Sequence, residues 1–463
     1  MAGFQGRHAC VRWTATLLLF VFLFDIPIYI PVPANAREDV CNVLTAGLDA
    51  CAAEIDLRAC RIAQTEIGGI LSDVFTAHPE FFFWSGRYTY TVDGDGFLQT
   101  VCPFYTMEGE ALAAARKELD GELDRMVAPV LPAWSAFEKA LYLHDAICLR
   151  FAYDDSYRIY DVYGFLREGV GVCQAYTGLY MLLLRRVGIP SVCAASAAMN
   201  HIWNLIFLDG AWYHADVTWD DAASGATGVR HTWFLKSDAG MSADGRHYDW
   251  QAPVTCTDLW YDKSPALRAA ESPLVFCVGN WYYIDNRPAV RGICRMDPET
   301  LTWTCVYRLD TAWYLAGNPE DACSEAYAGI GSFGGMLFFN TADSILSYDP
   351  ADDSLRVLHV PGKRDGLIFG MRIVGSTLTY LIADTPSEAH ARRIDLTDAD
   401  KRLFRRGDID GDGRVNVRDL TALGWALSDA DYACASAAAA DVNADGRVDA
   451  DDLEALRALI LTP

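Results

Sequence analysis

A cysteine in the middle of the chain has the setting of a catalytic nucleophile. Cys173 follows Gly169 and Gly171 and opens a strongly apolar segment that ends near 187–188, with Pro190 after it. This pattern predicts a helix that begins at the cysteine. The positive end of a helix dipole favours a thiolate, and the glycines let backbone and substrate approach closely. Cys173 is therefore a candidate nucleophile, although a lone cysteine in such a turn is more often a small buried residue.

A histidine and an aspartate downstream of Cys173 are candidates for the general base and for the carboxylate that orients it. Two alternating runs separated by Asp209 and Gly210 predict a β-hairpin. Pairing across its turn would bring His201 on the first strand close to Asp216 on the second. The hairpin would then hold an imidazole, and the carboxylate that orients it, facing the cysteine, as cysteine-dependent acyl transfer requires. Taken singly, His201 is more often a structural histidine and Asp216 a strand-end cap, but their order and spacing favour catalysis.

The C-terminal residues 405–463 repeat one calcium-loop pattern twice. Each loop has side-chain oxygens at positions 1, 3, 5, 9 and 12, a backbone carbonyl at position 7, and Gly413 or Gly446 at position 6 for the sharp turn. Position 12 is aspartate rather than the glutamate of ordinary EF-hands. We predict two calcium ions here and no cofactor for catalysis. The predicted ligands are Asp408, Asp410, Asp412, Arg414, Asn416 and Asp419 in the first loop, and Asp441, Asn443, Asp445, Arg447, Asp449 and Asp452 in the second.

An apolar-periodic helix is expected after each loop, at 420–427 and 453–461, but no comparable helix precedes either loop. The alternatives are an acidic solvated tail that matches by chance and a different calcium-binding helical pair.

Residues 1–36 have the composition of a secretory signal peptide. Arg7, His8 and Arg12 precede an apolar core at 13–24 and a small-residue cleavage site at 34–36. The alternative, an uncleaved membrane anchor, is disfavoured because the apolar run is short and is followed by Asp25 and three prolines. No other segment has enough consecutive apolar residues to span a bilayer. We expect a secreted, extracellular protein with no membrane span after signal cleavage.

The net charge and the cysteine content further restrict the class of protein. The net charge of −24 argues against a nucleic-acid partner, which would require clustered cations. Apart from Cys10 in the predicted signal and Cys173, twelve of the 14 cysteines remain, which permits six disulfides in an exported chain. An anaerobic exterior would instead leave many of them as buried thiols. No cysteine or histidine cluster has zinc spacing.

The remaining sequence predicts the domain order. Helices are expected at 40–53, 62–75, 108–130 and 136–151, with strands at 81–84 and 88–92 before a turn at 93–96. Residues 266–400 contain three loose copies of a strand meander, as in propeller blades, although three copies are few for a closed propeller. The predicted domains are a signal peptide at 1–36, a catalytic domain at 37–265 with its core at about 140–222, a β-rich domain at 266–400, and the calcium module at 405–463.

The catalytic segment resembles a known family. The strings GVCQAY, LHDAICLRFAYDD and NHIWNLIFLDGAWYHADVTWDD are similar to the bacterial transglutaminase-like superfamily, whose core is papain-like. The resemblance spans roughly residues 60–265. It implies that Cys173 is the nucleophile, His201 the general base and Asp216 its orienter. The Cys173 amide would be one donor of the oxyanion hole, and Tyr153 is the candidate for the second. Ala175 stands where many relatives have glycine, which leaves the triad intact.

The duplicated loop, with only its exiting helix, resembles a type I dockerin. The resemblance implies that a cohesin module of a cellulosome-type scaffold is the partner. It also implies contacts at loop positions 10 and 11, which are Val417, Arg418, Ala450 and Asp451. Because the two pairs differ, we expect the repeats not to present interchangeable faces.

Together these patterns predict a multidomain α+β protein with a papain-like transglutaminase core, a β-rich propeller-like domain and a small α-helical dockerin. The predicted function is a secreted, cellulosome-associated cysteine enzyme that acts on peptide or glutamine amides through a thioester, with hydrolysis slightly favoured over protein cross-linking. A rival is a non-catalytic polymer-binding scaffold protein with a vestigial triad. A glycoside hydrolase is suggested only because dockerins usually accompany polysaccharide-degrading enzymes, and no persuasive carboxylate pair supports it.

Overall fold

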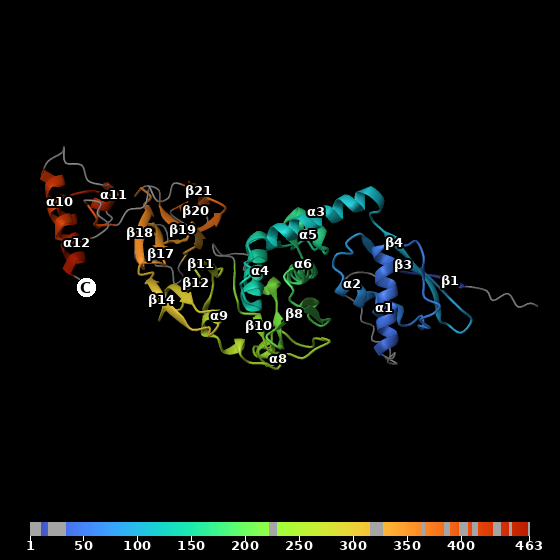
Figure 1. Cartoon of the computed structure of the whole chain (residues 1–463). Helices are drawn as coiled ribbons and strands as arrows, with labels where there is room; N and C mark the ends of the chain where they lie inside the picture. Colours follow the sequence, from blue (N-terminus) through green and yellow to red (C-terminus); the bar gives the residue numbers. More distant parts are fainter. Residues whose placement is uncertain are drawn as a thin grey trace, which may run out of the picture. The chain divides into compact units, whose positions relative to one another are not determined.

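The computed structural model describes residues 11–16, 34–221, 229–314, 327–362, 366–383, 389–397, 406–409, 415–428, 437–443 and 447–461. The chain has two compact units, Met1–Ala223 with Thr232–Lys263, and Ser224–His231 with Ser264–Pro463. Both helices and several separate sheets are present, and the described strands form no closed barrel (Figure 1).

Within the described residues, every helix is too short or too polar to cross a bilayer.

The first unit begins with a small α+β layer. Its four-stranded sheet has the order β1-β3-β4-β2, and its core is apolar. The elements are β1 (Val11–Thr16), α1 (Ala34–Asp49), β2 (Ile55–Asp56), α2 (Ile67–Ala77), β3 (Trp84–Val92) and β4 (Leu98–Tyr105). β1 lies inside the predicted signal peptide and pairs antiparallel with β3, so cleavage of that peptide would expose the edge of β3.

Three expected elements in this region have different bounds in the structure. The helix expected at 40–53 is α1, which begins at Ala34 and ends at Asp49. The helix expected at 62–75 begins only at Ile67, because Ala63 bridges to Phe97 and extends the sheet edge instead. The strand expected at 81–84 is a turn up to Trp84, whose backbone amide bonds the carbonyl of Phe81. The alternating aromatic pattern there reflects side chains packed into the core, and Phe81 and Phe83 are both buried.

The rest of the first unit places helices against a second antiparallel sheet of order β10-β9-β8-β7. Its central helix, α6, packs on β8 and is buried along most of its length (Figure 1). The elements are α3 (Gly109–Val127), α4 (Ala136–Arg150), β5 (Ala152–Tyr153), α5 (Val162–Glu168), β6 (Val170–Gly171), α6 (Cys173–Arg186), β7 (Ser191–Ser196), β8 (His201–Leu208), β9 (Ala211–Ala215), α7 (Val217–Asp220), β10 (Phe234–Lys236), α8 (Asp238–Ser242) and η1 (Tyr261–Lys263).

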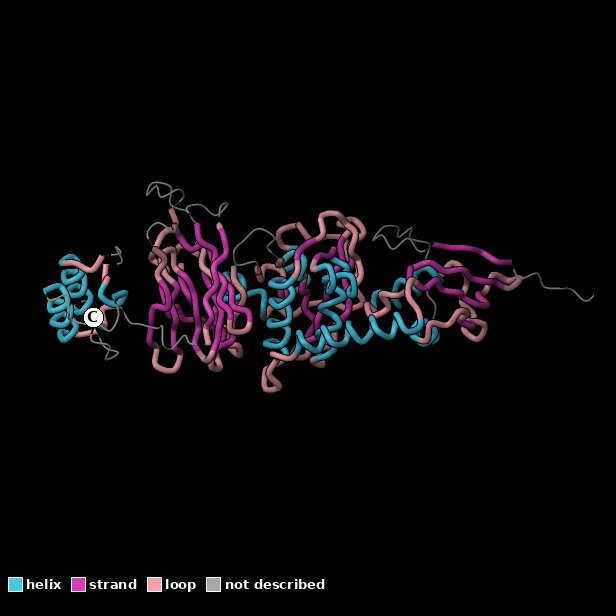
Figure 2. The backbone as a smooth tube through the Cα atoms, turned by 90° about the horizontal axis from the view of Figure 1, so that it is seen from above, coloured by secondary structure: helices cyan, strands magenta, loops and turns pink. Residues whose placement is uncertain are grey.

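The second unit contains three antiparallel meanders, which Figure 2 shows as layers of strands. The first two strands of each meander join at a tight turn with a glycine in the left-handed region, namely Gly279, Gly334 with Gly335, and Gly375. The elements are α9 (Pro265–Ala269), β11 (Val275–Cys277), β12 (Asn280–Asp285), β13 (Gly292–Met296), β14 (Trp303–Arg308), β15 (Ile330–Phe333), β16 (Met336–Asn340), β17 (Ile345–Asp349), β18 (Ser354–His359), β19 (Leu367–Val374), β20 (Thr377–Ala383) and β21 (His390–Asp395).

The C-terminal residues form α10 (Val417–Ser428), the short α11 (Ala437–Ala440) and α12 (Ala450–Leu461). α10 and α12 lie side by side over a small core that includes Leu423 and Leu456 (Figure 1). Both exiting helices occur where the sequence places them, each beginning within its loop. The predicted ligands Asp410, Asp412, Arg414 and Asp445 lie outside the described residues, as do Gly413 and Gly446.

The eleven cysteines in the described part of the chain are free thiols, whereas Cys323 and Cys434 lie outside it. The disulfide framework that was expected is therefore not present among these residues. They are unpaired thiols instead, and five of the eleven are buried. Burial raises the pKa of Cys193 and of Cys256, each to about 12, which disfavours the reactive thiolate at these two positions.

Candidate active site

Cys173 is the first residue of α6, as the glycine-rich approach and the apolar segment predict. It is only 5% exposed. Gly171 allows this placement, because a β-carbon there would lie 2.7 Å from Phe165 and 2.9 Å from Ala175. The thiol therefore sits at the positive end of a long buried helix, in a position that the close packing of Gly171 determines.

His201 and Asp216 meet beside this helix end. His201 is the first residue of β8 and pairs with Ser196 of β7. Its Nε2 donates to Oδ2 of Asp216 at 2.6 Å. Asp216 is not on the second hairpin strand, as expected, but follows β9 and caps α7, where its Oδ1 accepts from the Trp219 amide at 3.2 Å. The cap rather than strand pairing turns its carboxylate toward His201.

The charges of this pair are mutually stabilised. Burial alone would raise the pKa of Asp216, but His201 outweighs it and lowers this pKa to about 2. Burial likewise opposes a charge on His201, but Asp216, with a smaller contribution from the Cys173 thiol, raises the pKa of His201 to about 10. The arrangement favours an imidazolium next to the cysteine, with Nδ1 left to face the thiol because Nε2 is committed to the carboxylate.

Tyr153 lies close to the nucleophile. It is the second residue of β5, which pairs in parallel with β6 and sets Tyr153 opposite Gly171, two residues before the cysteine. Burial, and then the neighbouring Cys173, raise the pKa of its hydroxyl, so it stays protonated and able to donate a hydrogen bond. Tyr157 packs edge-on against its ring and is more than half exposed.

Sequence reasoning missed a second histidine on the same carboxylate. Nε2 of His247 donates to Oδ2 of Asp216 at 2.9 Å, and the His247 side chain is completely buried. It lies 31 residues beyond Asp216 in a turn-rich segment, where no periodicity or local motif could have linked the two. A structural role was expected for it instead.

His214 has the structural role that was expected. The Trp203 indole donates to its Nδ1 at 2.8 Å, so its proton resides on Nε2, which lies 2.8 Å from Asp238. Burial lowers the pKa of His214, and it stays a neutral link inside the sheet layer.

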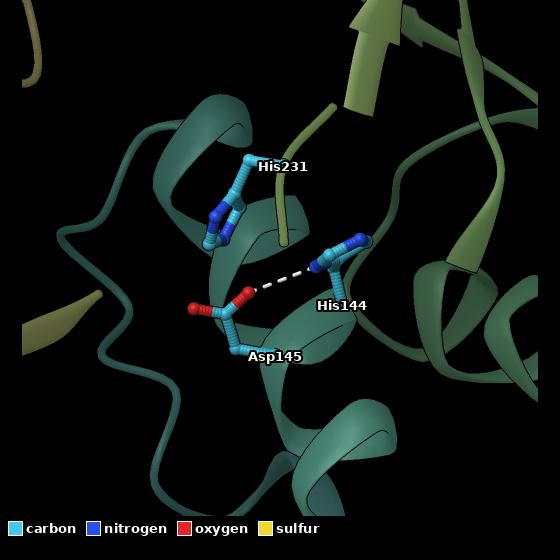
Figure 3. Close-up of side chains that lie close together, drawn as sticks. All are labelled: His144, Asp145 and His231. Carbon is cyan, nitrogen blue, oxygen red and sulfur yellow. Dashed lines mark hydrogen bonds and ion pairs between the residues drawn. The ribbon is translucent and has the colours of Figure 1, made fainter. Parts of the chain in front are cut away.

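A buried network supports the helix that carries Asp216. His144 on α4 lies 2.8 Å from Asp145 through Nδ1 (Figure 3). Its Nε2 lies 3.3 Å from Asp220, the last residue of α7. Burial opposes its charge, but the two carboxylates raise the pKa of His144 to about 9. Asp220 also accepts from the Trp233 amide. The network therefore ties α7 to α4 and limits the movement of Asp216 at the other end of α7.

The aspartate at position 12 of each C-terminal loop makes the same contacts, in which its carboxylate accepts hydrogen bonds from two backbone amides and so clamps the loop. Asp419 is buried, and its two oxygens accept from the amides of Ile409 at 2.7 Å and Asn416 at 2.8 Å. Asp452 is equally buried and accepts from Asn443 at 3.0 Å and Asp449 at 2.9 Å.

The predicted donor set consists of carboxylate, amide and backbone oxygens, so these residues fit a hard divalent cation. The loops' predicted partner contacts at Val417, Arg418, Ala450 and Asp451 are all exposed.

Comparisons with known proteins agree with these two regions. Residues 125–217 match the sequence profile of the transglutaminase-like superfamily, and residues 406–461 match that of the dockerin type I domain. No curated protein matches the sequence. A crystal structure of a TGase is similar at 9% identity over 42% of this chain, with a TM-score of 0.22. The structure of a Mycobacterium tuberculosis puromycin-hydrolyzing peptidase is similar at 19% identity over 27% of this chain, with a TM-score of 0.19.

The chain spans 50% of the first of these structures and 19% of the second. The two profile matches show that this protein contains a transglutaminase-like domain and a type I dockerin domain. The first belongs to a cysteine-dependent superfamily that is typically enzymatic. Type I dockerins in general bind calcium and dock to a cohesin, which implies an extracellular cellulosome context.

Proposed function

We propose that this protein is a secreted, scaffold-attached cysteine enzyme that cleaves amide bonds with Cys173, His201 and Asp216. The observation that carries the proposal is the 2.6 Å contact between His201 and Asp216 at the start of the helix that begins with Cys173. A vestigial site would have no reason to retain a buried carboxylate and an imidazole of raised pKa at that position.

The proposed reaction starts from a thiolate and an imidazolium. The Cys173 sulfur attacks the amide carbonyl carbon, and the carbonyl electron pair moves to oxygen, which the Cys173 amide and the Tyr153 hydroxyl stabilise. The tetrahedral intermediate collapses, His201 gives its proton to the leaving ammonia or amine, and a thioester remains. Neutral His201 then takes a proton from water, which attacks the thioester and releases a carboxylic acid. If a lysine amine attacks instead, the product is an isopeptide.

We propose hydrolysis, as a peptidase or amidase, as the main outcome, with cross-linking as the alternative. The protein is incubated with a peptide library in one reaction and with a glutamine peptide plus a labelled primary amine in the other. Peptide cleavage or ammonia release without amine incorporation supports hydrolysis, whereas amine incorporation supports cross-linking. If the wild type and Cys173→Ala behave identically in both reactions, the catalytic proposal is contradicted.

We further propose that the dockerin holds two calcium ions and docks the enzyme to a cohesin. Of the proposed ligands, Asp408, Asn416, Asp419, Asp441, Asn443, Arg447 (by its carbonyl), Asp449 and Asp452 are in the described residues. Calcium would join the two ends of each loop, and the exposed loop positions 10 and 11 would contact the cohesin.

The domain boundaries and the finer fold assignments are also proposals. We propose a papain-like core within 37–265 and a propeller-like arrangement at 266–400. The propeller-like arrangement is supported by β15, which packs against both β11 and β19, the first strands of the neighbouring meanders. Ser332 of β15 also donates to the Phe276 carbonyl of β11 at 3.0 Å. First strands that pack together in this way are typical of blades around an axis.

A further inference from the structure

His247 occupies a position beside the proposed triad that none of the proposed catalytic steps uses. Its Nε2 lies 2.9 Å from the same carboxylate oxygen that holds His201. Its ring lies 4.3 Å from the rings of both Trp219 and Trp233. Its Nδ1 is buried and has no hydrogen-bond partner in the described part of the chain. Nε2 is therefore the atom through which the His247 side chain acts on Asp216.

The contacts determine which nitrogen carries the proton. Because Asp216 accepts at Oδ2, Nε2 of His247 must be the protonated nitrogen. A second proton on Nδ1 would be buried without an acceptor, at a large cost in free energy. His247 therefore donates through Nε2 and gives the Asp216 carboxylate a second imidazole hydrogen bond.

We infer that His247 is a positioning residue that holds the Asp216 carboxylate in the orientation that His201 requires. The inference rests on the proposed function. The carboxylate has three donors: Trp219 on Oδ1, and His201 and His247 on Oδ2. Without His247, the carboxylate keeps one structural donor and can turn about its side-chain bonds, which weakens its hold on the imidazolium.

The titratable groups that face this carboxylate are His201, His247 and, on the neighbouring strand, His214, and Cys173 adjoins His201. His214 is held neutral by the Trp203 indole, so it supplies no alternative charge. Loss of the Asp216 contact would therefore lower the pKa of His201 from about 10 toward its ordinary value. The imidazolium beside Cys173 would then be lost at lower pH.

Two amide substitutions form a matched test. In His247→Gln the amide nitrogen replaces Nε2, whereas in His247→Asn it replaces Nδ1 and cannot reach Asp216. The rate of Cys173 alkylation by iodoacetamide is measured by intact mass across the pH range. We expect the labelling midpoint to move to higher pH and the rate at mildly acidic pH to fall about tenfold or more in His247→Asn. We expect His247→Gln to restore both.

A purely structural role predicts a different result, in which both variants lower the melting temperature and leave the labelling midpoint at its wild-type value. That outcome overturns the inference while leaving the proposed function standing. A wild-type protein that does not label at mildly acidic pH contradicts the proposed function itself. Nitrogen NMR of the wild-type imidazoles needs no variant: a proton on Nε2 of His247 supports the inference, and a proton on Nδ1 alone overturns it.

An independent observation concerns two thiols in the second unit. Cys294 on β13 and Cys305 on β14 are direct cross-strand partners. Opposite residues of antiparallel strands have α-carbons about 4.5–5.5 Å apart, within the range that a disulfide spans. Gly292, on the same face, leaves room for the sulfur, since a β-carbon there would lie 2.8 Å from Sγ of Cys305. Cys294 is fully buried, and Cys305 is partly exposed.

We propose that Cys294 and Cys305 form a reversible cross-strand disulfide in the oxidised protein. With a soluble disulfide such as oxidised glutathione, the Cys305 thiolate attacks one sulfur and releases a thiolate. Cys294 then loses its proton, attacks the Cys305 sulfur and releases the second thiolate. The protein loses two protons and two electrons, and the soluble disulfide becomes two thiols.

The test treats the full chain with oxidised glutathione, followed by alkylation and peptide mapping. We expect a linked peptide pair containing Cys294 and Cys305, and its loss together with a glutathione adduct on Cys294 or Cys305 in the single Ser variants. Reduction should restore both thiols. Full alkylation of both cysteines after oxidation, or links to other cysteines in their place, would overturn the proposal.

Discussion

Asp216 keeps its charge inside the protein because hydrogen bonds replace the water that it loses. Its two oxygens accept from one backbone amide and two imidazoles, and its pKa is lowered to about 2 despite complete burial. The same carboxylate raises the pKa of His201 to about 10. At the residue scale, the chemistry of the site therefore depends on one carboxylate and on the groups that hold it.

Replacement of Asp216 by Asn tests this dependence. An amide carries no negative charge, so we expect the pKa of His201 to fall from about 10 toward 6.5 and the imidazolium to be lost at neutral pH. The rate kcat/KM on an amide substrate should fall by about 10² to 10⁴. The control is Asp238→Asn, which faces His214 instead and should leave the pH profile unchanged. Equal profiles for Asp216→Asn and the wild type would contradict the account.

The same pair makes a testable contribution to folding stability. The raised pKa of His201 stabilises the fold fully below pH 6.5, and this contribution is lost as pH rises through about 10. The lowered pKa of Asp216 stabilises it above pH 3.8, and this contribution is lost as pH falls through about 2. We expect the melting temperature of the first unit to be highest between these limits. In Asp216→Asn the curve should flatten on both sides, which calorimetry across pH would measure.

Local sequence was sufficient to identify the proposed triad residues but not their support. Cys173, His201 and Asp216 lie in patterns that also determine local structure: a helix start, a strand and a cap. His247 has no such pattern, because it reaches Asp216 only through the packing of Trp219 and Trp233 around it. Residues that act through tertiary packing leave no periodic trace in a single sequence.

At the scale of elements, the short segment before α6 sets the position of the nucleophile. Gly171 packs against Phe165 of α5 and Ala175 of α6, with no space for a β-carbon. The hairpin of β8 and β9 and the helix α7 then bring the other two residues to the same helix end. Three elements must therefore keep their relative placement to within a fraction of an ångström for the contact to form.

Gly171→Ala is expected to displace the start of α6. The added methyl group clashes with Phe165 and Ala175, so we expect a destabilisation of about 1–3 kcal/mol. Iodoacetamide labelling of Cys173 should slow by about tenfold or more. The matched control is Gly121→Ala in α3, where a β-carbon meets nothing within 4 Å. That change should stabilise the protein by up to about 1 kcal/mol. Similar labelling rates for the two variants would contradict this role of Gly171.

Helices and strands were predicted correctly where the apolar residues of a segment repeat with a single clear period. The predictions failed where tertiary contacts determine the local structure. The helix α6 was expected from its apolar run and from the stop at 187–188, and the structure has it. The turn at Phe81–Phe83 looked like a strand because three packed aromatic rings imitate an alternating pattern. The residues before Ile67 looked helical but bridge to Phe97 instead. Asp216 looked like a strand residue but caps α7.

At the scale of the whole molecule, the proposed catalytic triad and the dockerin lie in separate units. The proposed triad lies in the first unit, and the dockerin lies in the second. The dockerin has a small core around Leu423 and Leu456, so we expect bound calcium to supply much of its stability.

Calcium removal tests this division. With excess chelator we expect loss of the helical signal of α10 and α12 and loss of cohesin binding, because calcium supplies the folding free energy of the loops. Cys173 labelling in the first unit should be unchanged. Asp419→Ala should mimic the chelator, whereas Asp451→Asn, which alters an exposed position that is not a proposed ligand, should keep the fold. Retained helicity and cohesin binding in excess chelator would contradict the prediction.

The central claim is that Cys173 is an activated nucleophile, and alkylation measured by intact mass tests it most directly. Purified protein is exposed briefly to iodoacetamide at mildly acidic pH, with Cys173→Ala as the control. The account predicts rapid addition of a single label in the wild type and none in the variant, because the other described cysteines lack an imidazolium partner. Equal labelling of the two folded proteins would contradict it and would favour a binding protein with a vestigial site.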